Sequence, residues 1–179
     1  MTKPALSLEP VLDALDSAVD DSIERLFSLL RIRSISTDPA YKDDCRAAAN
    51  WLAGDLASIG FDASVRDTDG HPMVVAHHDG PSADAPHVLF YGHYDVQPVD
   101  PKKWKKSPFE LDRTSEPGKL LARGAEDDKG PIATALYAMK TIRDRQIPFR
   151  REAREAEQGE AMVRVFEALG AGEDWRFRE

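Results

Sequence analysis

An uninterrupted apolar run, Val88–Tyr91, places the tightest constraint on what this 179-residue chain can fold into. Its four residues, VLFY, show no alternation of apolar and polar side chains, which is typical of a strand covered on both faces. Such a strand needs helices on both sides of its sheet. The run therefore predicts an α/β fold in which a central β-sheet is flanked by helices, and a strand end that opens onto a site.

Patterns for both kinds of element surround this run. Apolar residues recur at three- and four-residue steps over Val11–Arg33, which predicts one amphipathic helix. A second helix is expected over Pro39–Leu56 with Gly60 as its C-cap, and a third over Pro131–Ile142. Turn residues bound further strand candidates, which lie at residues 62–66, 73–77 and 120–123.

Composition excludes several classes of protein. No apolar run approaches the ~20 residues that a membrane-spanning helix requires, so no membrane association is expected. A formal net charge of -8 opposes general binding of nucleic acid, which needs a basic surface. The single cysteine, Cys45, excludes an internal disulfide and fits a reducing compartment. Because the N-terminus also lacks a secretory signal pattern, we expect a cytoplasmic protein in which His and carboxylate side chains hold any metal.

Two polar segments carry the candidate chemistry, and each follows a predicted strand. In the first, GHYDVQP at Gly92–Pro98, residues two apart on an extended backbone point the same way, so His93 and Asp95 can act as a pair. A metal-binding imidazole needs an acceptor at its other ring nitrogen, which makes His93 the candidate ligand and Asp95 its orienting partner. The second segment is ARGAEDDKG at Ala122–Gly130. Its three successive carboxylates repel one another unless a cation or a helix N-terminus balances them.

Spacing alone leaves simpler interpretations of both segments open. A His-x-Asp sequence is also typical of a hydrogen-bonded surface pair, and an Asp-Asp before a helix is also typical of a cap. Other candidate clusters are weaker. His77 and His78 are adjacent and would point to opposite faces of a strand, and the lysines of Lys102–Lys106 are typical of a solvated loop.

The amino-acid sequences of the two polar segments, with Trp104, Pro108 and Phe109 between them, resemble those of the aminoacylase and carnosinase-type family of zinc metallopeptidases. That family includes carboxypeptidase G, acetylornithine deacetylase and succinyl-diaminopimelate desuccinylase. The likeness spans roughly Val11–Pro148 and implies the N-terminal part of a zinc-dependent exopeptidase catalytic domain. The Asp-Asp-Lys-Gly-Pro sequence resembles the dipeptidase branch most.

The resemblance implies hydrolysis of peptide (dipeptide) or N-acyl amide bonds by water activated at two zinc ions, with manganese or cobalt as alternatives. It makes His93 a ligand of one zinc, Asp127 the carboxylate that bridges both ions, and Asp95 the residue that orients His93. It also implies a cis peptide bond between Asp127 and Asp128. The implied partners are a small peptide or N-acyl amino acid substrate and, in the family, a second copy in a homodimer.

The chain departs from the family's pattern after Pro148. The pattern next requires a strand that ends in two adjacent glutamates, one the general base and the other a zinc ligand. It then requires another acidic ligand, a lid domain that mediates dimerisation, and a late histidine. Residues 149–179 contain no adjacent glutamates, and we expect the lid and dimerisation domain to be absent.

Residue choice changes at the same point. Residues 1–148 contain 19 Asp, 5 Glu and 9 Lys, whereas residues 149–179 contain 1 Asp, 7 Glu and no Lys. We therefore predict a partial metallopeptidase catalytic domain over residues 1–148 and a divergent Arg/Glu-rich tail over 149–179, produced by frameshift, truncation or fusion. A natural domain that ends in a Glu/Arg-rich helix remains the alternative.

Two functions stay open at this point. One is a zinc-dependent hydrolase, and the other is a truncated, non-catalytic remnant that lacks the general-base glutamate and the remaining metal ligands. With two expected ligands, the 179-residue chain alone is expected to be inactive or a weak binder of one metal ion.

Overall fold

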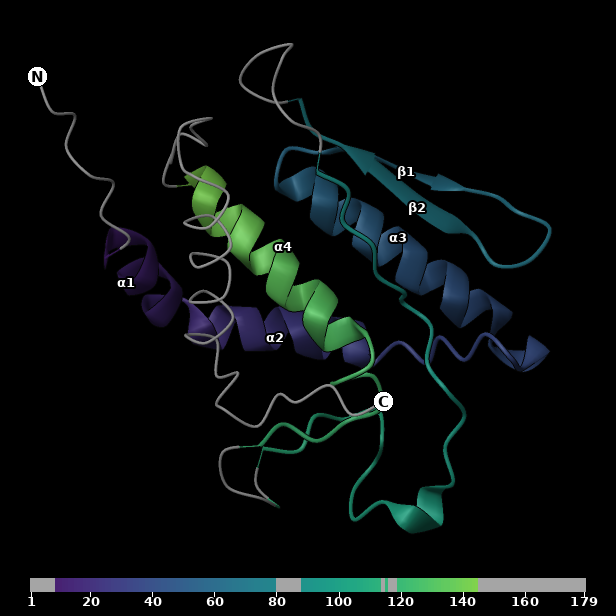
Figure 1. Cartoon of the computed structure of the whole chain (residues 1–179). Coiled ribbons are helices and arrows are strands. Elements are labelled where there is room, and N and C mark those ends of the chain that lie inside the picture. Colours follow the sequence, from purple (N-terminus) through teal and green to yellow (C-terminus); the bar gives the residue numbers. More distant parts are fainter. Residues whose placement is uncertain (1–8, 80–87, 114, 116–118, 145–179) are drawn as a thin grey trace, which may run out of the picture.

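The computed structural model describes residues 9–79, 88–113, 115 and 119–144 (Figure 1). The predicted tail at 149–179 and the boundary at Pro148 lie outside this range. The elements in chain order are α1 (Glu9–Ser17), α2 (Val19–Leu30), η1 (Pro39–Tyr41), α3 (Lys42–Ser58), β1 (Asp62–Arg66), β2 (Met73–His77), η2 (Pro101–Lys103) and α4 (Lys129–Asp144). None of the described helices is long and apolar enough to cross a bilayer.

The amphipathic pattern over Val11–Arg33 forms two helices, so the prediction of one helix is wrong. The chain turns at Ala18, whose N–H donates to Leu15 O over 3.1 Å. The Tyr137 hydroxyl of α4 also donates to Leu15 O, over 2.9 Å. An acceptor on α1 is thus used by a side chain from α4, and α1 packs its Val11 and Leu15 against α4. Periodicity continues through the turn because both helices bury one face against the same neighbour.

The hairpin of β1 and β2 confirms the two strands predicted at residues 62–66 and 73–77. The strands pair antiparallel, with Ser64 opposite Val75, and the polar segment between them forms the turn. Helix α3 packs against both strands (Figure 1). The predicted second helix is also confirmed. Its pattern begins in η1, α3 ends at Ser58, and Gly60 follows with φ +89, a conformation that favours glycine at a helix end.

One apolar cluster joins α2, α3 and α4. Its buried members are Leu29, Ala48, Leu52, Ile59, Ile132 and Leu136. Figure 1 shows α4 crossing α2, with α3 between these helices and the hairpin. The predicted third helix is confirmed, although α4 begins two residues before Pro131, so the two aspartates directly precede its first residue. The packed helices therefore fix where the second polar segment enters α4.

The central strand predicted at Val88–Tyr91 is wrong for this structure. The exposed fractions of residues Val88, Leu89, Phe90 and Tyr91 are 92%, 94%, 46% and 81%. The segment is drawn without an arrow and runs as an irregular trace between the hairpin and η2 (Figure 1). A strand needs a neighbour that shares its ladder of hydrogen bonds, and the one ladder within the described residues joins β1 to β2.

The strand predicted at residues 120–123 is also wrong, because it is reduced to a single bridge between Asp112 and Leu121. The described residues therefore form helices packed around a two-stranded antiparallel sheet. The central sheet flanked by helices on both faces is not formed by these residues.

Candidate metal site

The first polar segment is held in place by the chain that follows α2. Val96 N donates to Ser34 O over 2.9 Å, and Ser34 Oγ donates to Tyr94 O over 2.6 Å. Both Ser34 and Val96 are buried. These bonds keep residues 94–96 extended beside Ser34, so the side chains at positions 93 and 95 point the same way.

His93 and Asp95 form the pair that their spacing predicts. The distance from His93 Nδ1 to Asp95 Oδ1 is 2.9 Å. The other ring nitrogen, Nε2, lies 2.8 Å from Asp127 Oδ1, so the two polar segments meet across 34 residues of sequence. His93 and Asp95 are partly exposed and Asp127 is more so, which leaves this junction open to solvent.

The second polar segment reaches His93 through a tight turn ahead of α4. Gly124 has φ +85, and the peptide bond between Asp127 and Asp128 is cis, as the family resemblance implies. The Asp128 carboxylate contacts the His93 backbone instead of its ring, because Oδ2 accepts from His93 N over 3.1 Å, and its backbone O accepts from Ile132 N over 3.0 Å. Of the three successive carboxylates, Asp127 alone contacts the His93 ring among the described contacts.

Lys129 anchors the start of α4. Its side chain is fully buried, and its Nζ donates to Leu29 O over 3.0 Å and to Ile32 O over 2.6 Å. Leu29 lies in the last turn of α2 and Ile32 lies two residues after its end, where carbonyl groups have no i+4 helical donor. Burial lowers the pKa of Lys129 to about 8. This lysine fixes the turn that carries Asp127 against α2.

Charges at the junction favour a protonated imidazole when no metal is bound. Burial lowers the pKa of His93, but its hydrogen bonds to Asp95 and Asp127 and the charges of both carboxylates outweigh burial and raise the pKa above 6.5. Burial raises the pKa of Asp95, yet hydrogen bonds from Ser36 and His93 bring it below its ordinary value. The two carboxylates that attract a proton to His93 would equally attract a cation.

The metal-free chain is therefore expected to show a His93 titration midpoint above 6.5, measured from imidazole shifts by NMR. Because the native pKa is raised, the stability that this histidine contributes is fully present below about pH 6.5 and is lost as the pH rises through the native midpoint. Asp127→Asn should lower the midpoint, since it removes one of the two nearby charges. A midpoint in the unsubstituted chain at or below 6.5 would contradict the junction described here.

The residues present suit part of a metal site. An imidazole nitrogen and a carboxylate oxygen are ligands for zinc, manganese and cobalt, and the rear nitrogen of His93 is already held by Asp95. Zinc usually takes four ligands. Within the described part of the chain, no three His, Cys, Asp or Glu side chains are grouped closely enough to hold an ion. The described residues thus offer two ligands of a larger set.

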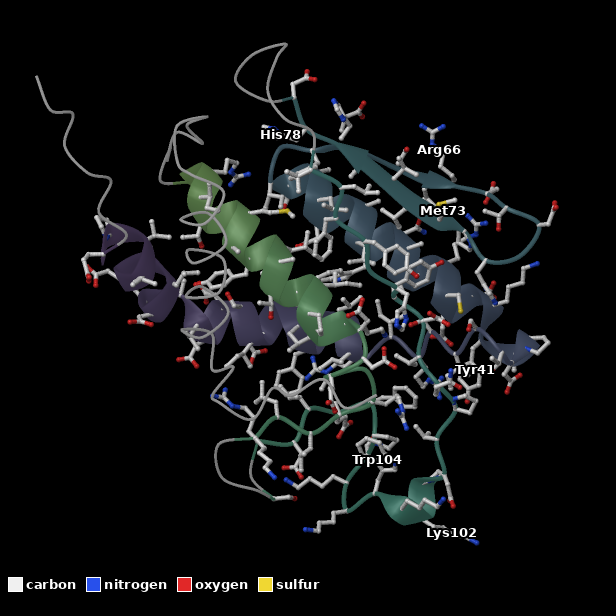
Figure 2. The ribbon with its side chains drawn as sticks, viewed as in Figure 1. Tyr41, Arg66, Met73, His78, Lys102 and Trp104 are labelled. Carbon is white, nitrogen blue, oxygen red and sulfur yellow. The ribbon has the colours of Figure 1, made fainter. Side chains whose placement is uncertain are left out.

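The other candidates from the sequence are used elsewhere. His77 pairs with Asp79 over 3.1 Å, and the His78 ring lies against Phe61. Trp104 stands beside η2 with its lysines, at a distance from the hairpin (Figure 2), and the Arg123 guanidinium lies over its ring. Burial raises the pKa of the Cys45 thiol, which fits a packed rather than a reactive cysteine.

Two residues that support the site were missed by sequence reasoning. Lys129 contacts backbone carbonyls 97 and 100 residues earlier, and Ser36 Oγ donates to Asp95 Oδ2 over 2.5 Å across 59 residues. Neither contact has a local signal. A serine after a helix and a lysine in a turn are ordinary surface residues until the fold brings their partners to them.

Comparison with known proteins identifies relatives of this chain. Residues 89–177 match the sequence model of peptidase family M20/M25/M40. The chain is 32% identical over 152 residues to the Cys-Gly metallodipeptidase DUG1 of Candida albicans, covering 78% of this chain and 31% of that protein. It is 32% identical over 157 residues to the Beta-Ala-His dipeptidase of Homo sapiens, covering 78% of this chain and 30% of that protein.

The solved structures that this chain resembles are also dipeptidases. The dipeptidase Dug1p of Saccharomyces cerevisiae matches with a TM-score of 0.70 at 26% identity, over 77% of this chain and 31% of that one. Human carnosine dipeptidase 1 matches with a TM-score of 0.70 at 28% identity, over 78% and 32%. The chain spans about a third of the length of these proteins.

The family match extends past Pro148 into residues outside the described part, so a boundary there stays a prediction. The relatives compared above are named as dipeptidases, which are hydrolases. The resemblance carried by the two polar segments is confirmed, and the chain belongs to peptidase family M20/M25/M40.

Proposed function

We propose that this chain supplies His93, Asp95 and Asp127 to a metal-dependent hydrolase of dipeptides or N-acyl amide bonds. The observation that carries the proposal is the contact of His93 Nε2 with Asp127 Oδ1 over 2.8 Å, with Asp95 behind the ring. It joins two segments that each resemble the family's metal motifs. Zinc is the proposed ion, with manganese or cobalt as alternatives, and the single cysteine supports a cytoplasmic location.

Each side chain has a stated task in this proposal. His93 binds the ion through Nε2, Asp95 holds the proton on Nδ1 and raises the basicity of the ring, and Asp127 supplies a carboxylate oxygen to one or two ions. A bound divalent ion supplies Lewis-acid polarisation of the scissile carbonyl and a water of lowered pKa. Because the Asp127 side chain is exposed, substrate and solvent could reach the proposed metal site.

A second candidate function is binding of one metal ion without turnover. It is favoured by one observation, namely that the described residues bring together two ligand-type side chains, while a group of three or more is not found among them. Two ligands leave most of a zinc coordination shell to water or to other residues. The dipeptide substrates and any homodimer belong to the first proposal and not to this one.

One experiment separates the two functions. The purified 179-residue chain is stripped of metal, and zinc, manganese and cobalt are titrated into it by calorimetry, followed by assays with Cys-Gly, β-Ala-His and an N-acetylated amino acid. Metal-dependent turnover with two ions per chain supports the hydrolase. One weakly held ion without turnover supports the second function, and no binding of any ion overturns both.

Asp95→Asn is expected to weaken zinc binding by about 10- to 100-fold, because it removes the charge that polarises His93 while keeping the side chain's size. The matched control is Asp79→Asn. It alters another His-x-Asp pair, between His77 and Asp79, on an exposed part of the hairpin. Calorimetric titration of both variants provides the measurement, and equal affinities in both would count against a role for Asp95.

A further inference from the structure

A hydrogen-bonded chain leads from His93 to a serine that no sequence motif marks. His93 Nδ1 lies 2.9 Å from Asp95 Oδ1, and the second oxygen of that carboxylate, Oδ2, accepts from Ser36 Oγ over 2.5 Å. We infer that Ser36 is a positioning residue of the metal site, acting through Asp95 to fix how the His93 ring is presented. The expected effect of Ser36 on metal binding rests on the proposed function, whereas the hydrogen-bonded chain itself does not.

The Ser36 hydroxyl is delivered to a fixed place. Two residues earlier, Ser34 is bonded to the site segment through both its side chain and its backbone carbonyl. The residue between them, Ile35, is 3% exposed, so this stretch is packed into the protein. On the far side, His71 Nε2 lies 2.7 Å from Ser36 O. The serine is therefore held from both directions, and its hydroxyl has little freedom to leave Asp95.

The hairpin is tied to the same segment at a second point. Burial raises the pKa of Tyr94 to about 12, so its hydroxyl stays protonated and donates to Pro72 O. Together with the contact of His71 and Ser36, this bond connects the residues just before β2 to both segments that form the site, the one that carries Ser36 and the one that carries Tyr94. The hairpin thus supports the backbone from which Ser36 and Asp95 extend.

The hydroxyl decides which carboxylate oxygen serves His93. Asp95 is about one-third exposed, and an unconstrained carboxylate there could rotate and exchange its oxygens with water. A hydroxyl that donates to an ionised acceptor makes one of the stronger hydrogen bonds in proteins. Because it occupies Oδ2, it leaves Oδ1 to accept the Nδ1 proton, so the ring presents Nε2 toward Asp127, where a bound ion would replace the second ring proton.

A purely structural role for Ser36 is the competing interpretation. It predicts that loss of the hydroxyl lowers stability without changing the state of the His93 ring. Ser36→Thr keeps a hydroxyl on the same carbon, so it serves as the conservative variant that should restore the site. Ser28→Ala is the matched control, since Ser28 Oγ donates over 3.1 Å to Glu24 O on an exposed face of α2.

The test reads the imidazole directly. Chain labelled with ¹⁵N-histidine is studied without metal by long-range ¹H–¹⁵N NMR, under conditions in which His93 is neutral, and zinc affinity is then measured by calorimetry. Ser36→Ala is expected to change the ratio of the Nδ1–H and Nε2–H tautomers of His93 and to weaken zinc binding by about 10-fold, at the lower end for residues that orient a ligand. Ser36→Thr should restore both readouts, and Ser28→Ala should change neither.

Each outcome decides the inference. An unchanged tautomer in Ser36→Ala overturns it, as does loss of folding in that variant, because the hydroxyl would then hold the fold and not the ring. If the unsubstituted chain binds no zinc, the proposed function fails, and the NMR readout still decides whether Ser36 fixes His93.

Discussion

Truncation of Lys129 to alanine is expected to lower the free energy of unfolding by about 4 kcal/mol. The side chain is fully buried between α2 and α4, so its removal leaves a cavity as well as two carbonyl groups without their ammonium donor. Urea unfolding followed by circular dichroism gives the change from the midpoint and slope. A loss below about 1 kcal/mol would show that α2 and α4 do not depend on this contact.

Lys129→Met separates packing from hydrogen bonding. Methionine keeps most of the aliphatic volume, and Leu29 O and Ile32 O each have a second donor, Ile32 N at 3.3 Å and Ser34 N at 2.9 Å. Removing a buried charge also relieves its desolvation. The methionine variant should therefore lose much less stability than the alanine variant, and equal losses would rule out packing as the main cause.

The same lysine makes stability depend on pH in a defined direction. Its native pKa of about 8 lies below the ordinary value of 10.5, so the native state releases this proton first. The unfolded state then binds more protons, and stability rises with pH between about 8 and 10.5. The neutral amine still has two N–H groups for its two acceptors. Relative to Lys129→Met, the unsubstituted chain should gain stability across this window.

Gly130→Ala is expected to cost about 3 kcal/mol of stability and to disturb the candidate site. A Cβ at this position would lie 1.9 Å from Ala125 O, a backbone atom that cannot move without moving the turn that carries Asp127. Gly130 N also donates to Gly124 O over 3.2 Å, so the two sides of the turn approach closely. Urea unfolding gives the loss, and the His93 NMR signal reports on the site.

Gly54→Ala provides the matched control for this substitution. Apart from its chain neighbours and the backbone of its own helix, no atom lies within 4 Å of a Cβ built at Gly54, which is in the interior of α3. Alanine is the better helix former, so this variant should be more stable by about 1 kcal/mol. Equal effects of the two substitutions would mean that the turn before α4 tolerates a side chain.

The parts of the fold that follow from short-range signals could be predicted from the sequence. The hairpin bounds, the entry into α4 near two aspartates, and the pairing of His93 with Asp95 each depend on residues a few positions apart. The prediction of a buried strand at residues 88–91 is wrong because burial depends on which distant segments cover the run. No pattern within four residues encodes those segments. At the split between α1 and α2, Leu15 O accepts from the Tyr137 hydroxyl of α4, 122 residues along the chain, and no local pattern encodes that contact.

The residues of the candidate site also fall into those that the sequence predicts and those that it does not. His93, Asp95 and Asp127 carry ligand chemistry in their side chains, so residue type alone makes them candidates. Ser36 contacts Asp95 through its hydroxyl, whereas Lys129 binds the backbone carbonyl of Leu29, and serines and lysines occur throughout any surface. Only the three-dimensional placement identifies them.

The bonds from Lys129 to the end of α2 also affect the order in which the chain folds. They join residues 100 and 97 positions apart, and the bond between Ser34 and Tyr94 spans 60 positions. Contacts between distant residues require a long loop to close first, which slows folding, whereas helices and the hairpin form from neighbours. During synthesis the carbonyl groups at the end of α2 therefore have no bond to Lys129 until that residue has been made. His93 contacts Asp127 only after the local elements have formed.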